Sequence, residues 1–131
     1  MNSAAGNDGT DACVESPSGA TGTLAVAAST PSDYFPTWSN YGVCARLTAP
    51  GQGVNGAWIG STTATRAVSG TSVSSPFVAG TSALFMSSKV YTAPYQVYWD
   101  LRKWATRGAI TNYPYYTPNA LLYQLDGASP P

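Results

Sequence analysis

A short and almost uninterrupted apolar run, from Thr23 to Ala28, is the feature that most constrains how this chain can fold. Gly22 precedes the run and a Ser-Thr-Pro turn sequence follows it, as is usual at the two ends of a short strand. A strand without polar alternation is typical of burial on both faces of a sheet. We therefore expect residues 23–28 to form an interior strand with other elements packed on each side.

Composition excludes several classes of protein. The 131 residues suffice for one domain, and 44% of them are hydrophobic, which is enough to fill a core. No apolar run approaches the roughly 20 residues that cross a bilayer, so we expect no membrane partner. Six basic and six acidic side chains cancel, which argues against a nucleic-acid partner. The chain has no histidine, so a mechanism that needs an imidazole must obtain it from elsewhere.

The rest of the chain alternates between strand and helix patterns. The predicted elements are a strand over 45–49, a hairpin over 54–59 and 63–68, a helix over 72–88 and a helix over 94–107. The first helix has Pro76 in its first turn and is apolar almost all round. Gly108 is predicted to end the second helix. We expect a single domain over 1–131, with a loose tail over about 126–131.

The strongest chemical signal is the segment from Ser69 to Gly80, with the sequence SGTSVSSPFVAG. A serine at the start of a buried helix has its own N–H, and the positive end of the helix, directed at whatever its hydroxyl attacks. This geometry makes Ser72 a candidate nucleophile. Most serines at helix starts are N-caps, however, so the residues alone leave both interpretations open.

The segment around Ser72 resembles the signature of the nucleophilic serine in the subtilisin-like serine proteases, or subtilases. Four more segments follow in the family's order at about its spacing: residues 4–7 (AAGN), 39–42 (SNYG), 49–51 (APG) and 117–122 (TPNALL). The resemblance is greatest to the proteinase K-like branch. It implies an α/β fold, namely the C-terminal part of a subtilisin-like domain with a mostly parallel sheet, and serine endopeptidase activity on peptides or proteins.

The resemblance also implies roles for individual residues. Ser72 corresponds to the acylated nucleophile, and Asn7 to the asparagine whose side-chain amide donates to the oxyanion. Ala4, Ala5 and Gly6 correspond to the strip that walls the pocket for the residue before the scissile bond, and their small size leaves room for a large apolar group. Without Ser72, the sequence Asn-Asp-Gly from Asn7 would be interpreted as a turn.

The chain also departs from the family pattern. In subtilases the catalytic Asp and His precede the point where this chain starts, so we expect it to be inactive unless a second polypeptide supplies them. Arg46 stands where proteinase K-like members carry a calcium-binding Asp, so we expect no metal there, and no cofactor is implied.

An alternative is that the chain is a noncatalytic structural or protein-binding module. It would then use the aromatic residues between Tyr91 and Tyr123 as a contact face. We favour packing as the role of those aromatics.

The two cysteines are evidence on whether the protein is secreted. Cys13 and Cys44 lie in loop-like settings, and from composition they could be paired or free. The resemblance implies a disulfide, because cysteines at these two places are paired in some proteinase K-like members. We therefore expect a secreted, extracellular protein.

Overall fold

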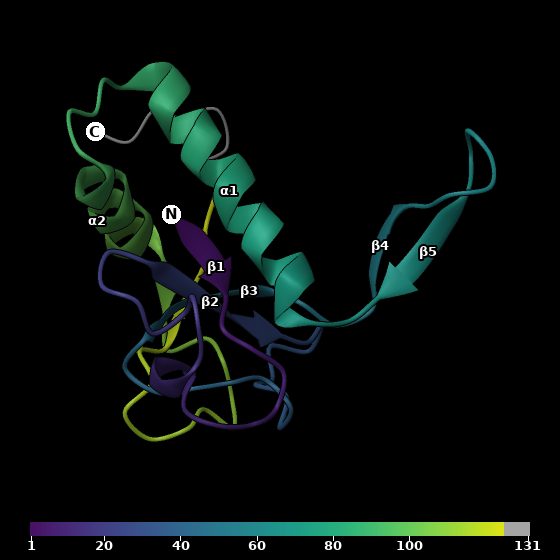
Figure 1. The fold of residues 1–131 in the computed structure, drawn as a ribbon, viewed down its shortest axis with the longest axis horizontal. Helices are drawn as coiled ribbons and strands as arrows, with labels where there is room; N and C mark the ends of the chain where they lie inside the picture. The colour runs from purple at the N-terminus through teal and green to yellow at the C-terminus, as the bar shows by residue number, and fades with distance from the viewer. Residues whose placement is uncertain (125–131) are drawn as a thin grey trace.

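The computed structural model describes residues 1–124 and contains a five-stranded sheet that organises most of the chain (Figure 1). The predicted tail over 126–131 lies outside the described residues. Neighbouring strands are parallel except for the last pair, which is antiparallel. In spatial order the strands are β1 (Asn2–Ala4), β2 (Leu24–Ser29), β3 (Ala45–Pro50), β7 (Ala120–Leu121) and β6 (Thr106–Arg107).

Strand β2 confirms the prediction of a strand buried on both faces, since all six of its residues are buried. Successive side chains of a strand point to opposite faces. Leu24 and Val26 accordingly join one core cluster with residues of both helices, whereas Ala25 and Ala27 join a second cluster with Phe35. Helices cover one face of the sheet and loops cover the other (Figure 1).

Helix α1 (Thr71–Ser88) begins one residue before its predicted start and packs on the sheet through Val78 and Phe85, which are two turns apart. Pro76 is its sixth residue and lies in the second turn, not in the first as we predicted, and it leaves the Ser72 carbonyl without its usual helical partner. As predicted, α1 is apolar almost all round. Within residues 1–124, however, the side of the helix that faces away from the sheet is exposed.

Helix α2 (Pro94–Trp104) is shorter than predicted. The chain becomes extended at Ala105, and Thr106 and Arg107 form β6, which pairs with β7. The prediction of a helix to residue 107 was therefore wrong, because strand pairing with a segment more than ten residues later competes with the last helical turn. Arg107 lies in a strand and Gly108 in the turn after it, with a positive φ of 67°.

An ion pair between an exposed lysine and a buried aspartate joins the two helices. Lys89, just after α1, lies 2.7 Å from the Asp100 carboxylate of α2, and the Tyr91 hydroxyl donates to the same oxygen at 2.9 Å. Burial and the bond to Asp100 raise the pKa of Tyr91 to about 12. Burial alone would raise the pKa of Asp100, but the hydrogen bonds from Lys89 and Tyr91, with the nearby cations, lower it below its ordinary value.

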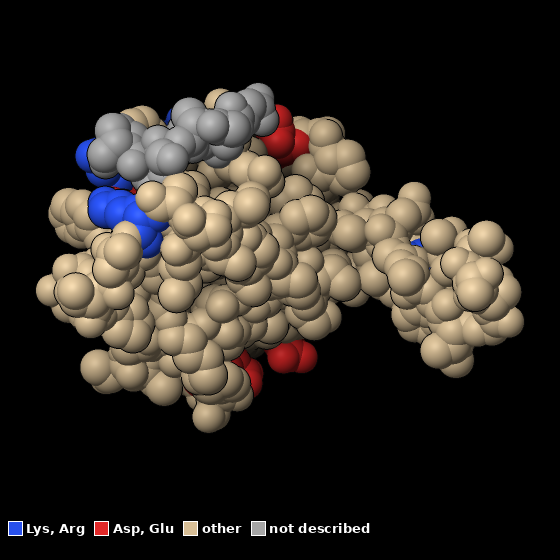
Figure 2. Space-filling view, turned by 90° about the horizontal axis from the view of Figure 1, so that it is seen from above, with Lys and Arg blue, Asp and Glu red and all other residues tan. Residues whose placement is uncertain are grey.

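The predicted hairpin is present as a separate two-stranded sheet of β4 (Val54–Ala57) and β5 (Thr65–Val68). Each strand is shorter than predicted, because residues 58–64 form a longer turn closed by a bond from the Trp58 N–H to the Ala64 carbonyl (2.8 Å). The hairpin projects from the body as an arm (Figure 2). Within residues 1–124, no helix is both long enough and apolar enough to cross a membrane.

Candidate active site

Ser72 is the second residue of α1, and its side chain is exposed. Gly70, with a φ of 150°, is the N-cap of the helix and has no side chain of its own to cap it. The cap interpretation of Ser72 is therefore wrong, since its hydroxyl does not serve the helix end. The Ser72 N–H, like the other first N–H groups of a helix, has no partner within the helix. Both groups lie at the positive end of α1.

Asn7 reaches the same helix end from the loop that follows β1. Its Oδ1 accepts two hydrogen bonds from Thr71, one from the backbone N–H at 2.8 Å and one from Oγ1 at 2.9 Å. These two bonds occupy the acceptor of the side-chain amide, and they determine its orientation. The donor, Nδ2, is thereby turned away from Thr71.

Gly70 lies beside both that donor and the Ser72 hydroxyl. A Cβ atom built on Gly70 would lie 3.1 Å from Ser72 Oγ and 3.5 Å from Asn7 Nδ2. The two groups therefore face one small space, which a side chain at this position would fill. Its positive φ also favours glycine. The structure thus brings together Ser72 and Asn7, which the sequence places 65 residues apart.

Thr71 and Asn40 support this arrangement, and sequence analysis assigned neither of them a role. Thr71 is fully buried, and its Oγ1 also accepts from the Gly6 N–H at 3.1 Å. Asn40 is fully buried too, and its Oδ1 accepts from the Asp8 and Thr10 N–H groups at 2.9 and 3.0 Å. The available signal was motif membership, since Asn40 belongs to SNYG and Thr71 precedes Ser72 in GTS.

The strip from Ala4 to Gly6 lies between these supports. Ala4 and Gly6 are partly exposed, whereas Ala5 is fully buried, with its N–H donating to the Val26 carbonyl at 3.0 Å. A Cβ on Gly6 would collide with the side-chain amide of Asn40, and Gly6 has a φ of 109°. Only Ala4 and Gly6 of the strip are therefore open to contact with another molecule through their own exposed surface.

The surroundings of Ser72 carry little charge. The first turn of α1 contains no acidic residue, and no side chain of this chain is an imidazole. Among residues 1–124, no three His, Cys, Asp or Glu side chains gather as a group that could hold a metal ion. The described residues around Ser72 therefore offer a hydroxyl and neutral donors, and a nucleophilic role for that hydroxyl would require a base from elsewhere.

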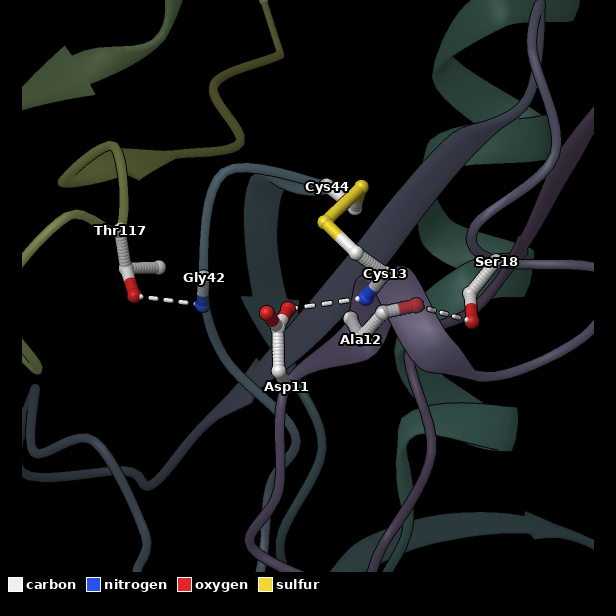
Figure 3. The surroundings of a disulfide bond; sticks show 7 residues. All are labelled: Asp11, Ala12, Cys13, Ser18, Gly42, Cys44 and Thr117. Carbon is white, nitrogen blue, oxygen red and sulfur yellow. Dashed lines mark hydrogen bonds between the residues drawn. A yellow bond between two sulfur atoms is a disulfide. The ribbon is translucent and has the colours of Figure 1, made fainter.

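Cys13 and Cys44 are joined by a disulfide, which confirms the pairing that the resemblance implied (Figure 3). Their Cα atoms are 5.2 Å apart, within the usual range. The N–H of Cys13 also donates to Asp11 Oδ1 at 2.9 Å, and the nearby Gly42 N–H donates to Thr117 Oγ1 at 2.8 Å. The disulfide therefore ties the loop after Asn7 to the chain just after the SNYG segment. The bond from Gly42 to Thr117 links SNYG to the C-terminal TPN segment.

Comparison with known proteins identifies similar chains. The subtilase family matches residues 2–120. An extracellular serine proteinase from Thermus sp. (strain Rt41A) is 45% identical over 120 residues, which cover 92% of this chain and 29% of that protein. Alkaline protease 2 of Aspergillus fumigatus (strain Af293) is 40% identical over 135 residues, which cover 96% of this chain and 27% of that protein.

Solved structures show the same likeness in three dimensions. The crystal structure of a cold adapted subtilisin-like serine proteinase superposes with a TM-score of 0.87 at 35% identity, covering 93% of this chain and 44% of the other. A protease from Pseudoalteromonas arctica superposes with a TM-score of 0.81 at 25% identity, over 91% of this chain and 39% of the other. The predicted α/β fold with a mostly parallel sheet is confirmed, and the chain spans less than half of each of these relatives.

Proposed function

The chain belongs to the subtilase family, and from this membership we propose that it contributes the nucleophile and the oxyanion hole of a serine endopeptidase. Ser72 is the proposed nucleophile. Asn7 Nδ2 and the Ser72 N–H are the proposed oxyanion donors. The observation that carries this proposal is that Ser72 Oγ and Asn7 Nδ2 face one small space beside Gly70, at the positive end of α1.

The geometry is suited to acyl transfer. Ser72 Oγ forms a bond to the carbonyl carbon of a peptide, and the electron pair of the C=O bond moves onto the oxygen. Asn7 Nδ2 and the Ser72 N–H then donate to that oxyanion, and because Thr71 holds Asn7 in place, little reorganisation is needed. The tetrahedral species expels the amine. The proton of Ser72 goes to a base and then to this leaving group, so a base is indispensable.

We propose that a further polypeptide segment supplies that base, as the catalytic His and Asp of subtilases. The solved relative above is more than twice as long as the region that this chain covers. One flank of α1 is suited to receive the segment, since Phe77 and Leu84, two turns apart, are both exposed there. A cavity of about 440 Å³ on this side lies between Val54 and Phe77. Without the segment we expect no turnover.

The proposed substrates are peptides and proteins with a large apolar residue before the scissile bond. Ala4 and Gly6 support this preference, since their small and partly exposed surfaces leave room for such a side chain. We also propose an extracellular location, because the Thermus relative is named extracellular and because disulfides such as Cys13–Cys44 persist in oxidising compartments.

A fluorophosphonate probe tests the proposal, because it labels only an activated serine. We expect the assembled protein, with its His-bearing segment, to be labelled at Ser72 and the isolated chain not to be labelled. Ser72→Ala should abolish labelling. Ser87→Ala, an exposed serine at the other end of the same helix, is the matched control and should label like the wild type. A fully assembled wild-type protein that stays unlabelled would exclude the endopeptidase.

That negative result would favour the second candidate, a noncatalytic protein-binding module. Tyr95 and Trp99, one turn apart on α2, are each 70% exposed and support such a contact face. Our prediction that the C-terminal aromatics pack inward fails for these two residues and for Tyr115, Tyr116 and Tyr123, which are also exposed. Tyr98 and Trp104 do pack against the core. Co-purification of a partner that Trp99→Ala releases would establish the module.

A further inference from the structure

The SNYG segment, residues 39–42, is a sequence motif that has no part in the proposed chemistry so far. Ser39 and Asn40 are both fully buried. Ser39 Oγ accepts a hydrogen bond from the Ala28 N–H at 3.1 Å, so the segment is anchored at the carboxyl end of β2. Strand β1 runs parallel to β2, and the loop that carries Asn7 leaves β1 at the same end of the sheet. The segment therefore lies where it can support that loop.

The loop from Asn7 to Thr10 has little packing of its own. Asn7, Asp8 and Thr10 are exposed, so few apolar contacts hold the loop in one position. A donor that acts on a transition state must nevertheless be held to within about 0.5 Å. Thr71 bonds to the side chain of Asn7 and to Gly6, which leaves the backbone after Asn7 to other partners. Hydrogen bonds from elsewhere must therefore fix the loop.

Asn40 bonds to the backbone on both sides of Asn7. Its Oδ1 accepts from the Asp8 N–H at 2.9 Å and from the Thr10 N–H at 3.0 Å, and both of these groups follow Asn7. Its Nδ2 donates to the Ala5 carbonyl at 3.1 Å, which precedes Asn7. One buried side chain thus fixes both the loop that carries the proposed oxyanion donor and the strip that is proposed to hold the substrate.

The contacts of Asn40 require an amide side chain. An amide combines an acceptor for two N–H groups with a donor for a carbonyl, whereas a carboxylate has no donor. The fit is also close. The Asn40 N–H donates to the Gly6 carbonyl at 3.0 Å, and a Cβ atom built on Gly6 would collide with Asn40 Nδ2. The strip therefore lies directly against the amide, so a shift of the amide would shift the strip.

We propose that Asn40 is a positioning residue for two parts of the site at once, the oxyanion donor and the strip from Ala4 to Gly6. This inference rests on the proposed function. Because Asn40 is fully buried, it acts through the groups it bonds and does not touch a substrate. Its Oδ1 bonds place Asn7 and should act mainly on kcat. Its Nδ2 bond places the Ala5 carbonyl in the strip and should act mainly on KM.

A double-mutant cycle on the assembled protein, with its His-bearing segment, tests the role of Asn40. The measured quantity is the rate of fluorophosphonate labelling of Ser72. Asn40→Ala should slow labelling about 10- to 100-fold, because a small misplacement of a catalytic group has effects of this size. In the Asn7→Ala background the same substitution should slow labelling by less than about threefold, since the donor that it positions is already absent. Asn119→Ala is the matched control and should label like the wild type, because Asn119 bonds to the Ile110 backbone on another loop.

A second variant separates the two sets of bonds. Asn40→Asp keeps the acceptor for Asp8 and Thr10 but loses the donor to the Ala5 carbonyl. With a fluorogenic peptide that has a large apolar residue before the scissile bond, it should keep kcat within about threefold of the wild type and raise KM at least about threefold. Asn40→Ala should lower kcat as well. If Asn40→Ala does not fold, Asn40→Ser takes its place in the cycle, since its hydroxyl stops one bond short of the position of Oδ1.

Three results would overturn the inference while leaving the proposed function intact. If Asn40→Ala labels at the wild-type rate, Asn40 positions nothing that the reaction uses. If it slows labelling by the same factor with and without Asn7, it only supports the fold. If Asn40→Asp loses as much kcat as Asn40→Ala, the Oδ1 bonds do not place Asn7. If the assembled wild-type protein is not labelled at all, the proposed function fails and the role of Asn40 fails with it.

Discussion

The two ends of α1 carry polar networks that differ in what they leave unsatisfied. At the amino end, Thr71 and Asn7 bond to each other through neutral groups and leave the Ser72 hydroxyl exposed. At the carboxyl end, Lys89 and Tyr91 converge on one oxygen of Asp100, a carboxylate that is 7% exposed. The first network leaves Asn7 Nδ2 and the Ser72 hydroxyl free to bind another molecule. The second uses its polar groups on one another.

We infer from this difference that the amino end of α1 serves chemistry and the carboxyl end serves stability. A group that is to act on a substrate must be held in position while its reactive atom stays free, and neutral hydrogen bonds achieve this at the amino end. A buried charge destabilises a fold unless it is paired, and the pairing at the carboxyl end leaves nothing to react. We therefore expect substitutions at the amino end to change rates, and substitutions at the carboxyl end to change the free energy of unfolding.

The largest effect is expected from the proposed oxyanion donor. Asn7→Ala should slow acylation of the assembled protein by a factor of about 100 to 1,000, or ~3–4 kcal/mol, because it removes a donor to the developing negative charge. Asn7→Asp sharpens the test, since it keeps the acceptor for Thr71 but replaces the donor by a negatively charged oxygen. The aspartate variant should be at least as slow as the alanine variant but more stable to denaturant. An active Asn7→Asp protein would contradict the assignment.

The next effect is on stability at the carboxyl end. Asp100→Asn should lower the free energy of unfolding by about 2 kcal/mol, because Lys89 and Tyr91 lose the anionic acceptor they share. Denaturant titration measures the change. Asp33→Asn removes an exposed carboxylate and should change stability by less than about 0.5 kcal/mol. If Asp100→Asn also slowed the labelling of Ser72 in folded protein, the two ends of α1 would not be independent.

A smaller effect is expected from the residue that orients Asn7. Thr71→Val keeps the shape and the backbone N–H but removes Oγ1, so one of the two bonds to Asn7 Oδ1 is lost. We expect kcat to fall about tenfold, which corresponds to ~1.4 kcal/mol, with little change in KM. Thr71→Ser, which restores the hydroxyl, should recover most of the rate. A change confined to KM would show that Thr71 does not act through the transition state.

The smallest effect is the dependence of stability on pH. The folded pKa of Asp100 is below its unfolded value, so its contribution is present above the unfolded pKa and is lost as the pH falls through the folded pKa. The pKa of Tyr91 is raised from 10.0 to about 12, so its contribution is present below pH 10.0 and is lost as the pH rises toward 12. Unfolding titrations across pH should show both losses in the wild type, whereas Tyr91→Phe should show a smaller alkaline loss, because burial also raises the pKa values of Tyr98 and Tyr113. An unchanged alkaline loss in Tyr91→Phe would assign it to another group.

Local patterns in the sequence predicted much of the fold. The apolar run that became β2, the start of α1 and the pairing of β4 with β5 all depend on neighbouring residues, and their predictions hold to within a few residues. The end of α2 was not predictable in this way. It depends on the pairing of Thr106 and Arg107 with Ala120 and Leu121, which no local pattern around α2 encodes.

The candidate site also has features that the sequence predicts and features that depend on distant contacts. The sequence by itself determined that a serine would lie at the start of a helix and that no histidine of this chain could activate it. Through the motifs, it also predicted that Asn7 would lie beside that serine. Only the tertiary structure decided how Asn7 is held, because its two bonds come from Thr71, 64 residues away. It also decided that the hairpin projects beside the site. Contacts over such separations form only when the sheet brings distant loops together, so local sequence carries no direct record of them.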